Sequence, residues 1–362
     1  MSHSDAKPLR GRPELASLAD LADFDEIIDA RSPGEYEEDR IPGAVNLPVL
    51  DNEERARVGT LYKQVSPFEA KRLGAALVSR NIARHLEGPL ASKPKHYRPL
   101  VYCWRGGTRS GSLTHVLRSI GWQAAQLEGG YKLYRKTVIA ELDSQPERHR
   151  FIVICGPTGS GKSRFLRALS ELGGQVLDLE ELAAHMGSVL GAYPARPQPS
   201  QKLFESLVWD ALRRFDPARP VYVESESKKI GNLHTPETLL RRMRASECLN
   251  LTAPVLVRVA LLKEEYAHFL AAPTRLNTQL ERLTDLRGRE TVARWKQQAE
   301  SGRWDELVTE LLEQHYDPAY QRSLGRNFIR SAESPTLVLD SPAEPYILGL
   351  AQSVLDAAKA AA

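Results

Sequence analysis

Residues 151–163 read FIVICGPTGSGKS, and this stretch decides the fold of the second half of the chain. Residues 151–155 are apolar, as in a buried β-strand, and a helical pattern begins at Lys162. The loop between them satisfies G-x-x-x-x-G-K-S, a phosphate-binding pattern when it joins a strand to a helix. We expect its amides to surround a diphosphate, Lys162 to neutralise the terminal phosphate, and Ser163 to offer a hydroxyl to Mg²⁺. The candidate diphosphate-binding residues are Gly156, Thr158, Gly159, Ser160, Gly161, Lys162 and Ser163.

Apolar runs and helical patterns alternate beyond this loop, which predicts a doubly wound parallel sheet. Further strands are predicted at residues 175–179, 221–223, 255–262 and 337–339, with a final helix at 345–361. An enzyme that hydrolyses ATP usually has an Asp after a second apolar strand to organise Mg²⁺. Here the strand at 221–223 is followed by Glu224 and Glu226, which are candidate Mg²⁺ or substrate ligands. Whether the loop holds ATP or another diphosphate stays open.

The first third of the chain predicts another α/β domain, built around a cysteine loop. Strands are expected at residues 24–29, 100–102 and 124–127, with helices at 67–79 and 110–120. Cys103 ends a strand just before a helix, where unpaired backbone N–H groups and the helix dipole favour a thiolate. Two arginines and two glycines beside it suit an anion cradle better than a merely packed cysteine. Cys103 is therefore the candidate catalytic nucleophile, in an anion loop of Arg105, Gly106, Gly107, Thr108, Arg109 and Ser110.

Three separated motifs resemble the rhodanese family: DARSPGEY at residues 29–36, IPGAVN at 41–46, and the cysteine loop. The resemblance implies that Asp29 and Arg31 support the architecture of the site and that Cys103 carries the transferred chalcogen atom. The spacing from Cys103 to Arg109 and Ser110 also matches the signature of cysteine-dependent phosphatases. The loop alone does not separate these two chemistries.

Length and composition limit the organisation of the chain. At roughly 150 residues per domain, 362 residues predict two or three domains. We expect a rhodanese-like domain at 1–143, a P-loop core at 144–273, a helical region that contacts RNA or substrate at 274–335, and a last strand and helix at 336–362. Three cysteines without paired spacing argue against a disulfide framework or a structural metal site. The absence of a long apolar segment predicts no membrane span and a cytoplasmic location.

The charge of the chain does not by itself indicate RNA. The net charge is +3, from 49 basic and 46 acidic residues. Residues 213–244 are locally richer in basic residues, eight against four acidic ones. Solvated helix surfaces and phosphate contacts both explain such a segment.

The order of the two domains, together with VESESKKIG at residues 223–231 and HYDPAY at 315–320, resembles the tRNA 2-selenouridine synthase family over about residues 15–345. The resemblance implies conversion of 2-thiouridine to 2-selenouridine at the tRNA wobble position, U34. Geranyl diphosphate would first alkylate the sulfur, and selenium from selenophosphate, accepted by Cys103 as a selenylsulfide, would then replace it. The implied partners are a 2-thiouridine tRNA, selenophosphate and geranyl diphosphate, with Mg²⁺ as a candidate ion and no tightly bound cofactor.

Two other enzymes fit the same motifs. One is an ATP-dependent tRNA thiolase or RNA-modifying kinase that uses a rhodanese persulfide, and the other is a cysteine-dependent phosphatase fused to a nucleotide-binding domain. Trp104, Tyr316 and Tyr320 are candidates to hold the base or the prenyl chain, with core packing as the competing interpretation. The oligomeric state stays open, a monomer included.

Overall fold

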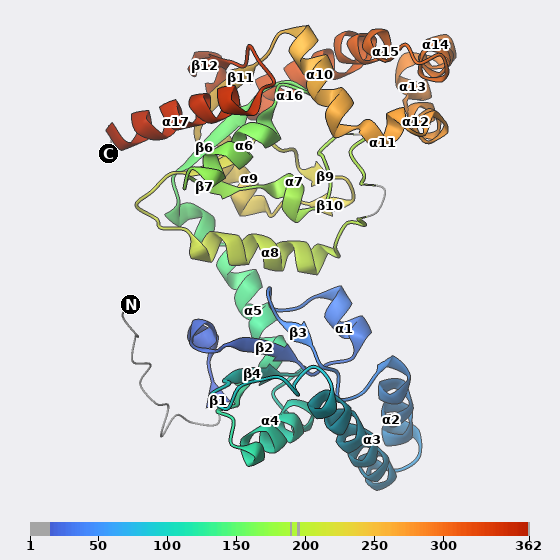
Figure 1. Ribbon diagram of the computed structural model, residues 1–362, viewed down its shortest axis with the longest axis vertical. Coiled ribbons are helices and arrows are strands. Elements are labelled where there is room, and N and C mark those ends of the chain that lie inside the picture. Colours follow the sequence, from blue (N-terminus) through green and yellow to red (C-terminus); the bar gives the residue numbers. More distant parts are fainter. Residues whose placement is uncertain (1–14, 189, 194–195, 361–362) are drawn as a thin grey trace. The chain divides into compact units, whose positions relative to one another are not determined.

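The computed structural model describes residues 15–188, 190–193 and 196–360. The chain divides into two compact units, residues 1–141 and 142–362, and each contains a five-stranded parallel sheet (Figure 1). Parallel neighbours need a crossover connection, usually a helix, which explains why strands and helices alternate along the chain. The predicted α/β class is confirmed.

In the first unit the strands lie in the order β1-β5-β4-β2-β3, and every pair is parallel. The strands are β1 (Leu15–Ala16), β2 (Glu26–Asp29), β3 (Val45–Asn46), β4 (Pro99–Tyr102) and β5 (Ala125–Leu127). The predicted strands at 24–29, 100–102 and 124–127 correspond to β2, β4 and β5. Every residue of the central strand β4 is buried, and this strand leads directly into the cysteine loop.

Helices connect the strands of this first sheet. They are the 3₁₀ helix η1 (Leu18–Asp23), α1 (Pro33–Glu38), α2 (Asn52–Gln64), α3 (Pro67–Glu87), α4 (Thr108–Ile120) and α5 (Gly130–Leu142). The helix predicted from residue 67 begins there, because the Ser66 side chain accepts a hydrogen bond from the amide of Glu69. It continues beyond the predicted end at residue 79, since its apolar face still packs into the core at Ile82.

In the second unit the strands lie in the order β12-β11-β6-β8-β7, again all parallel. They are β6 (Phe151–Cys155), β7 (Gln175–Leu177), β8 (Val221–Glu224), β11 (Glu247–Thr252) and β12 (Thr336–Val338), and a separate hairpin pairs β9 (Lys229–Ile230) with β10 (Leu233–His234). The helices that accompany the sheet are η2 (Gln145–Arg148), α6 (Lys162–Glu171), α7 (Leu179–Leu182), α8 (Gln201–Arg214), α9 (Glu237–Arg244), α10 (Val255–Glu265) and α17 (Glu344–Ala360).

The predicted strand at residues 255–262 is wrong, because this segment is the helix α10. A nearly continuous apolar run satisfies the periods of both a strand and a helix. In the structure Val259 and Leu262 are buried while Leu256 is exposed, which is a helical pattern. The strand lies just before it, at β11, where Asn250 interrupts the apolar pattern. The side-chain Nδ2 of Asn250 donates to the carbonyl of Ser331 at 2.8 Å.

The segment after α10 is almost entirely helical. It contains α11 (Ala267–Leu270), α12 (Pro273–Leu280), η3 (Glu281–Leu283), α13 (Thr284–Arg287), α14 (Arg289–Glu300), α15 (Trp304–Leu311), a π-helical turn (Leu312–Tyr316), α16 (Asp317–Asn327) and η5 (Ile329–Glu333). These helices bury an apolar cluster of their own around Trp295, which is fully buried. Within the described ranges, no helix has both the length and the apolar character needed to cross a bilayer.

Candidate functional site

The cysteine loop begins where β4 ends, at the carboxyl edge of the first sheet. Cys103 is buried, with 3% of its surface exposed, and α4 starts at Thr108. Two glycines allow this tight path: Gly106 has a φ of 65°, and a Cβ at Gly130 would collide with the carbonyl oxygen of Cys103. The amide of Tyr131 donates to that carbonyl at 2.8 Å. The start of α5 therefore fixes the course of the loop.

The two arginines of the loop have different surroundings. Arg105 is exposed, whereas Arg109 donates to the carboxylate of Glu35 at 2.8 and 3.4 Å. Arg55 of α2 reaches the same carboxylate at 3.0 Å. Burial alone raises the pKa of Glu35, but hydrogen bonds from Arg109 and Ser32 and the charge of both arginines outweigh it, so the pKa lies below its usual range. An anion that enters the loop must compete with Glu35 for Arg109.

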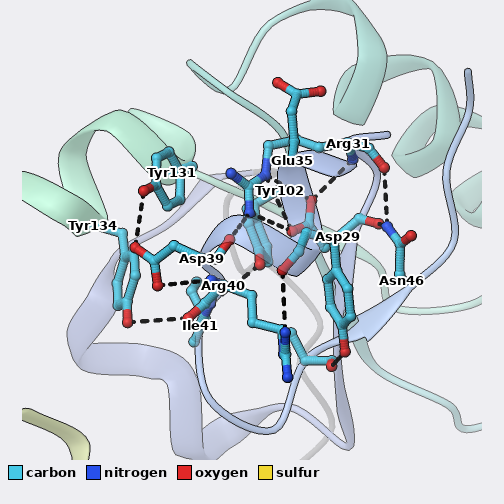
Figure 2. A network of polar contacts seen from close by, with 12 residues as sticks. Asp29, Arg31, Glu35, Asp39, Arg40, Ile41, Asn46, Tyr102, Tyr131 and Tyr134 are labelled. Carbon is cyan, nitrogen blue, oxygen red and sulfur yellow. Dashed lines mark hydrogen bonds and ion pairs between the residues drawn. The ribbon is translucent and has the colours of Figure 1, made fainter. Parts of the chain in front are cut away.

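Asp29 and Arg31, predicted to support the site, form a buried bidentate ion pair. Their shortest contact is 2.6 Å, and their side chains are 0% and 1% exposed. The same guanidinium donates to the carbonyl of Asp39 and lies 4.0 Å from the ring centroid of Tyr131. Asn46 donates to the carbonyls of Asp29 and Arg31 at 2.9 Å each (Figure 2). The pair thus connects β2 to β3 and to α5, the helix that holds the cysteine loop.

The phosphate-binding loop joins β6 to α6, as its sequence pattern predicts. The Lys162 ammonium donates to the carbonyls of Gly156 and Pro157 at 2.7 and 3.3 Å. Gly159 and Gly161 have φ values of 76° and 87°, which side chains rarely adopt. A loop of this form, continued by a helix N-terminus, can direct several amides at one phosphate.

Three glutamates lie beside this loop: Glu224 and Glu226 are buried, and Glu180 is partly buried. Ser163 Oγ donates to Glu180 Oε2 at 2.9 Å, and the amide of Glu180 donates to Glu224 Oε1 at 2.8 Å. Burial, followed by the charge of Glu226, raises the pKa of Glu180 to about 8, and burial also raises the pKa values of Glu224 and Glu226. The structure therefore adds Glu180 to the two glutamates predicted from the sequence. Its only sequence signal is its place directly after the predicted strand at 175–179.

The P-loop and two of these glutamates, Glu180 and Glu226, line part of a cavity of about 670 Å³. Another part of its lining is an apolar and aromatic wall, formed by Leu262, Tyr266, Tyr316, Tyr320, Ile347 and Leu348, and charged side chains that include Arg164, Arg167, Glu264 and Glu265 line the rest. The candidates Tyr316 and Tyr320 thus belong to the P-loop cavity, whereas Trp104 belongs to the cysteine-bearing unit and is 39% exposed. Across the described residues, no group of three or more His, Cys, Asp or Glu side chains is arranged to hold a metal ion.

A buried arginine connects the P-loop to the helical segment. Arg258 of α10 donates through Nε and Nη2 to the carbonyl of Thr158 at 2.9 and 2.8 Å. The same guanidinium contacts the carboxylate of Asp317 at 2.9 and 2.6 Å. Sequence reasoning missed both Arg258 and Asp317. The available signal is that Asp317 lies between Tyr316 and Tyr320 in the HYDPAY motif.

Several side chains of the basic segment at 213–244 are already paired within the unit. Arg213 and Arg214 contact Asp210 at 2.8 and 2.7 Å, and Arg241 contacts Glu147 at 3.2 Å. These pairs favour the interpretation of the segment as salt-bridged helix surface.

Two family models match the chain in the order that its motifs predict. The rhodanese-like domain matches residues 13–137, and the tRNA 2-selenouridine synthase AAA domain matches residues 149–283. The first match contains the cysteine loop and the second contains the P-loop with the glutamates beside it.

Curated relatives agree with these matches. The tRNA 2-selenouridine synthase of Nitrosomonas europaea is 39% identical over 244 residues, which cover 66% of this chain and 63% of that protein. The enzyme of the same name from Nitrosomonas eutropha is 37% identical over 266 residues, 70% of this chain and 67% of the relative. That from Shewanella loihica is 31% identical over 340 residues, 84% of this chain and 89% of the relative. The chain therefore belongs to the tRNA 2-selenouridine synthase family.

Proposed function

We propose that this chain replaces the sulfur of 2-thiouridine by selenium at the wobble position U34 of tRNA, in two steps that use its two anion-binding loops. The observation that carries the proposal is the cavity in which a P-loop and an aromatic wall meet, on a chain that also holds a cysteine in a rhodanese-like loop. The names of the relatives support the overall reaction. The proposed substrates are a 2-thiouridine tRNA, geranyl diphosphate and selenophosphate.

In the first step the thiocarbonyl sulfur attacks the first carbon of the geranyl group. The S–C bond forms, the C–O bond to diphosphate breaks, and the base releases its N3 proton to solvent. Lys162 and the amides of the P-loop stabilise the charge that develops on the leaving diphosphate. Ser163 and Glu180 offer oxygen ligands of the kind Mg²⁺ prefers, and that ion would add to the neutralisation of the diphosphate.

The wall of the cavity suits the rest of this substrate. A geranyl chain is apolar, and Tyr316 and Leu262 lie in the same cavity as the P-loop. No phosphoanhydride is hydrolysed in this step. The step therefore needs no residue that activates water. Glu224 stands at the end of β8, where an enzyme that hydrolyses ATP usually has the Asp that organises Mg²⁺.

In the second step selenium replaces the geranylated sulfur at C2 of the base. Selenium held on Cys103 as a selenylsulfide is two electrons more oxidised than selenium in selenophosphate, and neither substrate supplies an oxidant. We therefore favour a redox-neutral role in which the Cys103 thiolate attacks phosphorus. The S–P bond forms, the P–Se bond breaks, and selenide leaves and takes a proton from solvent.

Hydroselenide then attacks C2. The C–S bond breaks, and the sulfur leaves as geranylthiol with the proton of hydroselenide. Water cleaves the S–P bond to phosphate and regenerates Cys103. The spacing from Cys103 to Arg109 and Ser110, shared with cysteine-dependent phosphatases, supports attack at phosphorus.

Mass analysis of tRNA nucleosides tests the two steps. With geranyl diphosphate alone we expect S-geranyl-2-thiouridine, and after addition of selenophosphate we expect 2-selenouridine. Lys162→Ala should lose the first product, whereas Lys263→Ala, which removes an exposed ion pair with Asp305, should retain it. An unchanged 2-thiouridine in the presence of both substrates would overturn the proposal.

Additional measurements separate the alternatives. ATP hydrolysis stimulated by tRNA would support the thiolase or kinase, and phosphate release from an aryl phosphate without RNA would support the phosphatase. The peptide that contains Cys103 is analysed after exposure to selenophosphate. An adduct without the isotope pattern of selenium supports the phosphoryl intermediate, and an adduct with that pattern supports the selenylsulfide.

A further inference from the structure

The sulfur of Cys103 has a hydrogen-bond partner that is itself held by a residue outside every sequence motif. Ser110 Oγ lies 3.0 Å from Cys103 Sγ. Gln126, on β5, brings its Nε2 to 2.9 Å from the same hydroxyl and 3.2 Å from the carbonyl oxygen of Gly107. Ser110 is fully buried. Solvent therefore does not reach the Ser110 hydroxyl, and the neighbouring protein groups determine which atom donates and which accepts.

The carbonyl of Gly107 determines how the amide of Gln126 is oriented. A carbonyl oxygen can only accept, so the part of the amide that faces it must be the NH₂ group. The same NH₂ group faces Ser110. The Ser110 oxygen therefore accepts a hydrogen bond from Gln126 and must direct its own proton elsewhere.

That proton has two acceptors within reach, Cys103 Sγ at 3.0 Å and the Gly107 carbonyl at 3.3 Å. The carbonyl already accepts from the amide of Gly111 at 3.0 Å and from Gln126, which occupies both of its lone pairs, and the Cys103 thiol is directed at the same oxygen at 4.0 Å. Ser110 consequently donates to the sulfur. A hydrogen bond donated to sulfur is stronger when the sulfur is charged, so it favours the thiolate.

We infer that Gln126 is a positioning residue for Cys103, because it holds Ser110 as a hydrogen-bond donor to the sulfur. The order of donation is Gln126 to Ser110 to Cys103. This inference deepens the proposed function and rests on it for the role of Cys103 as the nucleophile toward the selenium donor. It does not depend on the RNA substrate.

The test is the rate at which iodoacetamide alkylates Cys103 in the full chain, followed by peptide mass analysis over a range of pH. The thiolate attacks the methylene carbon and iodide leaves, so the rate reports the thiolate fraction. Ser110→Ala should react about tenfold more slowly near neutral pH. Its rate should rejoin that of the unmodified chain at high pH, which a merely structural defect would not produce.

Two substitutions at Gln126 test the direction of donation. In Gln126→Glu the carboxylate accepts the proton of Ser110 and reverses the hydrogen bond. The alkylation rate of Cys103 should therefore decrease as much as in Ser110→Ala. Gln126→Met leaves the Gly107 carbonyl with one acceptor position free, so Ser110 donates part of the time to this carbonyl and part of the time to Cys103 Sγ. The decrease in the alkylation rate should therefore be smaller than in Ser110→Ala. Ser119→Ala is the control, because this hydroxyl on the same helix donates to the carbonyl of His115, and its rate should be unchanged.

The outcomes are distinct. If Ser110→Ala reacts like the unmodified chain at every pH, the hydrogen bond to sulfur has no effect and the inference fails. If Ser110→Ala is alkylated slowly but both Gln126 variants are alkylated at the rate of the unmodified chain, Gln126 does not position Ser110. Thermal unfolding verifies that each variant is folded. If Gln126→Glu does not fold, the alkylation rate of Gln126→Met tests the role of Gln126. A chain that shows this order of rates but forms no 2-selenouridine would overturn the proposed function and leave the inference standing.

Discussion

The hydroxyl of Ser163 lies 2.9 Å from the carboxyl oxygen Oε2 of Glu180. Ser163 is the last residue of the P-loop pattern, and Glu180 lies on α7, just beyond the carboxyl end of β7. The hydroxyl at this position of a P-loop is the one that can ligate Mg²⁺. The residue that would bind the ion therefore donates its hydroxyl proton to a partly buried carboxyl group.

The protonation of Glu180 predicts a pH dependence of stability. Its pKa is raised to about 8 in the folded protein from an ordinary value of 4.5. The folded state thus holds a proton that the unfolded chain releases. This stabilisation is complete below about pH 4.5 and is lost as pH rises through about 8. In the unmodified chain, the free energy of unfolding should decrease by on the order of 2–4 kcal/mol between about pH 5 and pH 9. In Glu180→Gln this decrease should be absent.

Urea unfolding of both proteins across this pH range provides the measurement. Glu181→Gln is the matched control, because Glu181 is 56% exposed and pairs with Arg196 at the surface. Its pH dependence should equal that of the unmodified chain. An unchanged pH dependence in Glu180→Gln would contradict the assignment of the titration to Glu180.

Cys103→Ser should stop selenium insertion and leave geranylation intact, because the first step uses no thiol. Nucleoside mass analysis should show S-geranyl-2-thiouridine accumulating in the presence of both substrates. Cys248→Ala, which removes another buried thiol on β11, should retain both steps. Loss of geranylation in a folded Cys103→Ser protein would show that the two loops do not divide the reaction as proposed.

The contact between Arg258 and Asp317 predicts an effect on the P-loop. Asp317→Ala leaves a buried guanidinium without its counter-charge, so the free energy of unfolding should decrease by about 2 kcal/mol. The carbonyl of Thr158 is then less firmly held, and the KM for geranyl diphosphate should rise about tenfold. Steady-state kinetics with varied diphosphate concentration, together with urea unfolding, measures both effects.

Two further substitutions calibrate this prediction. Arg258→Lys should resemble Asp317→Ala, since one ammonium cannot reproduce the planar set of donors to both Thr158 and Asp317. Lys263→Met also removes a charge pair from α10, but that pair is largely exposed, so the stability should change by less than about 0.5 kcal/mol. A normal KM in Asp317→Ala would mean that the ion pair does not position the loop.

The buried pair of Asp29 and Arg31 predicts a large loss of stability on substitution. Arg31→Met would leave the Asp29 carboxylate, which is 0% exposed, without a positive partner, and should destabilise the protein by about 3–5 kcal/mol. Arg72→Met serves as the control because the pair of Arg72 with Glu69 lies on the surface of α3. Chemical denaturation compares the two variants, and equal effects would contradict the structural role of Arg31.

The local motifs of this chain were readable from its sequence because each is a continuous stretch. A strand, a glycine-containing loop and a helix N-terminus follow one another at Cys103 and again at Lys162, and the residue order alone specifies both loops. At residues 255–262 the local pattern predicted a strand where the chain forms a helix. Hydrophobic periodicity does not distinguish a helix from a strand in this apolar run. The strand β11, which precedes α10, was not predicted because Asn250 interrupts its apolar pattern.

The partners of these loops were decided by the tertiary structure. Glu35 meets Arg109 from 74 positions away, and Asp317 meets Arg258 from 59. Gln126 reaches Ser110 because β5 lies next to β4 in the sheet. Such contacts depend on the order of strands and the crossing of helices, which periodicity along the chain does not encode. The sequence by itself thus determined the two reactive loops, and only the folded sheets determined which side chains position and charge them.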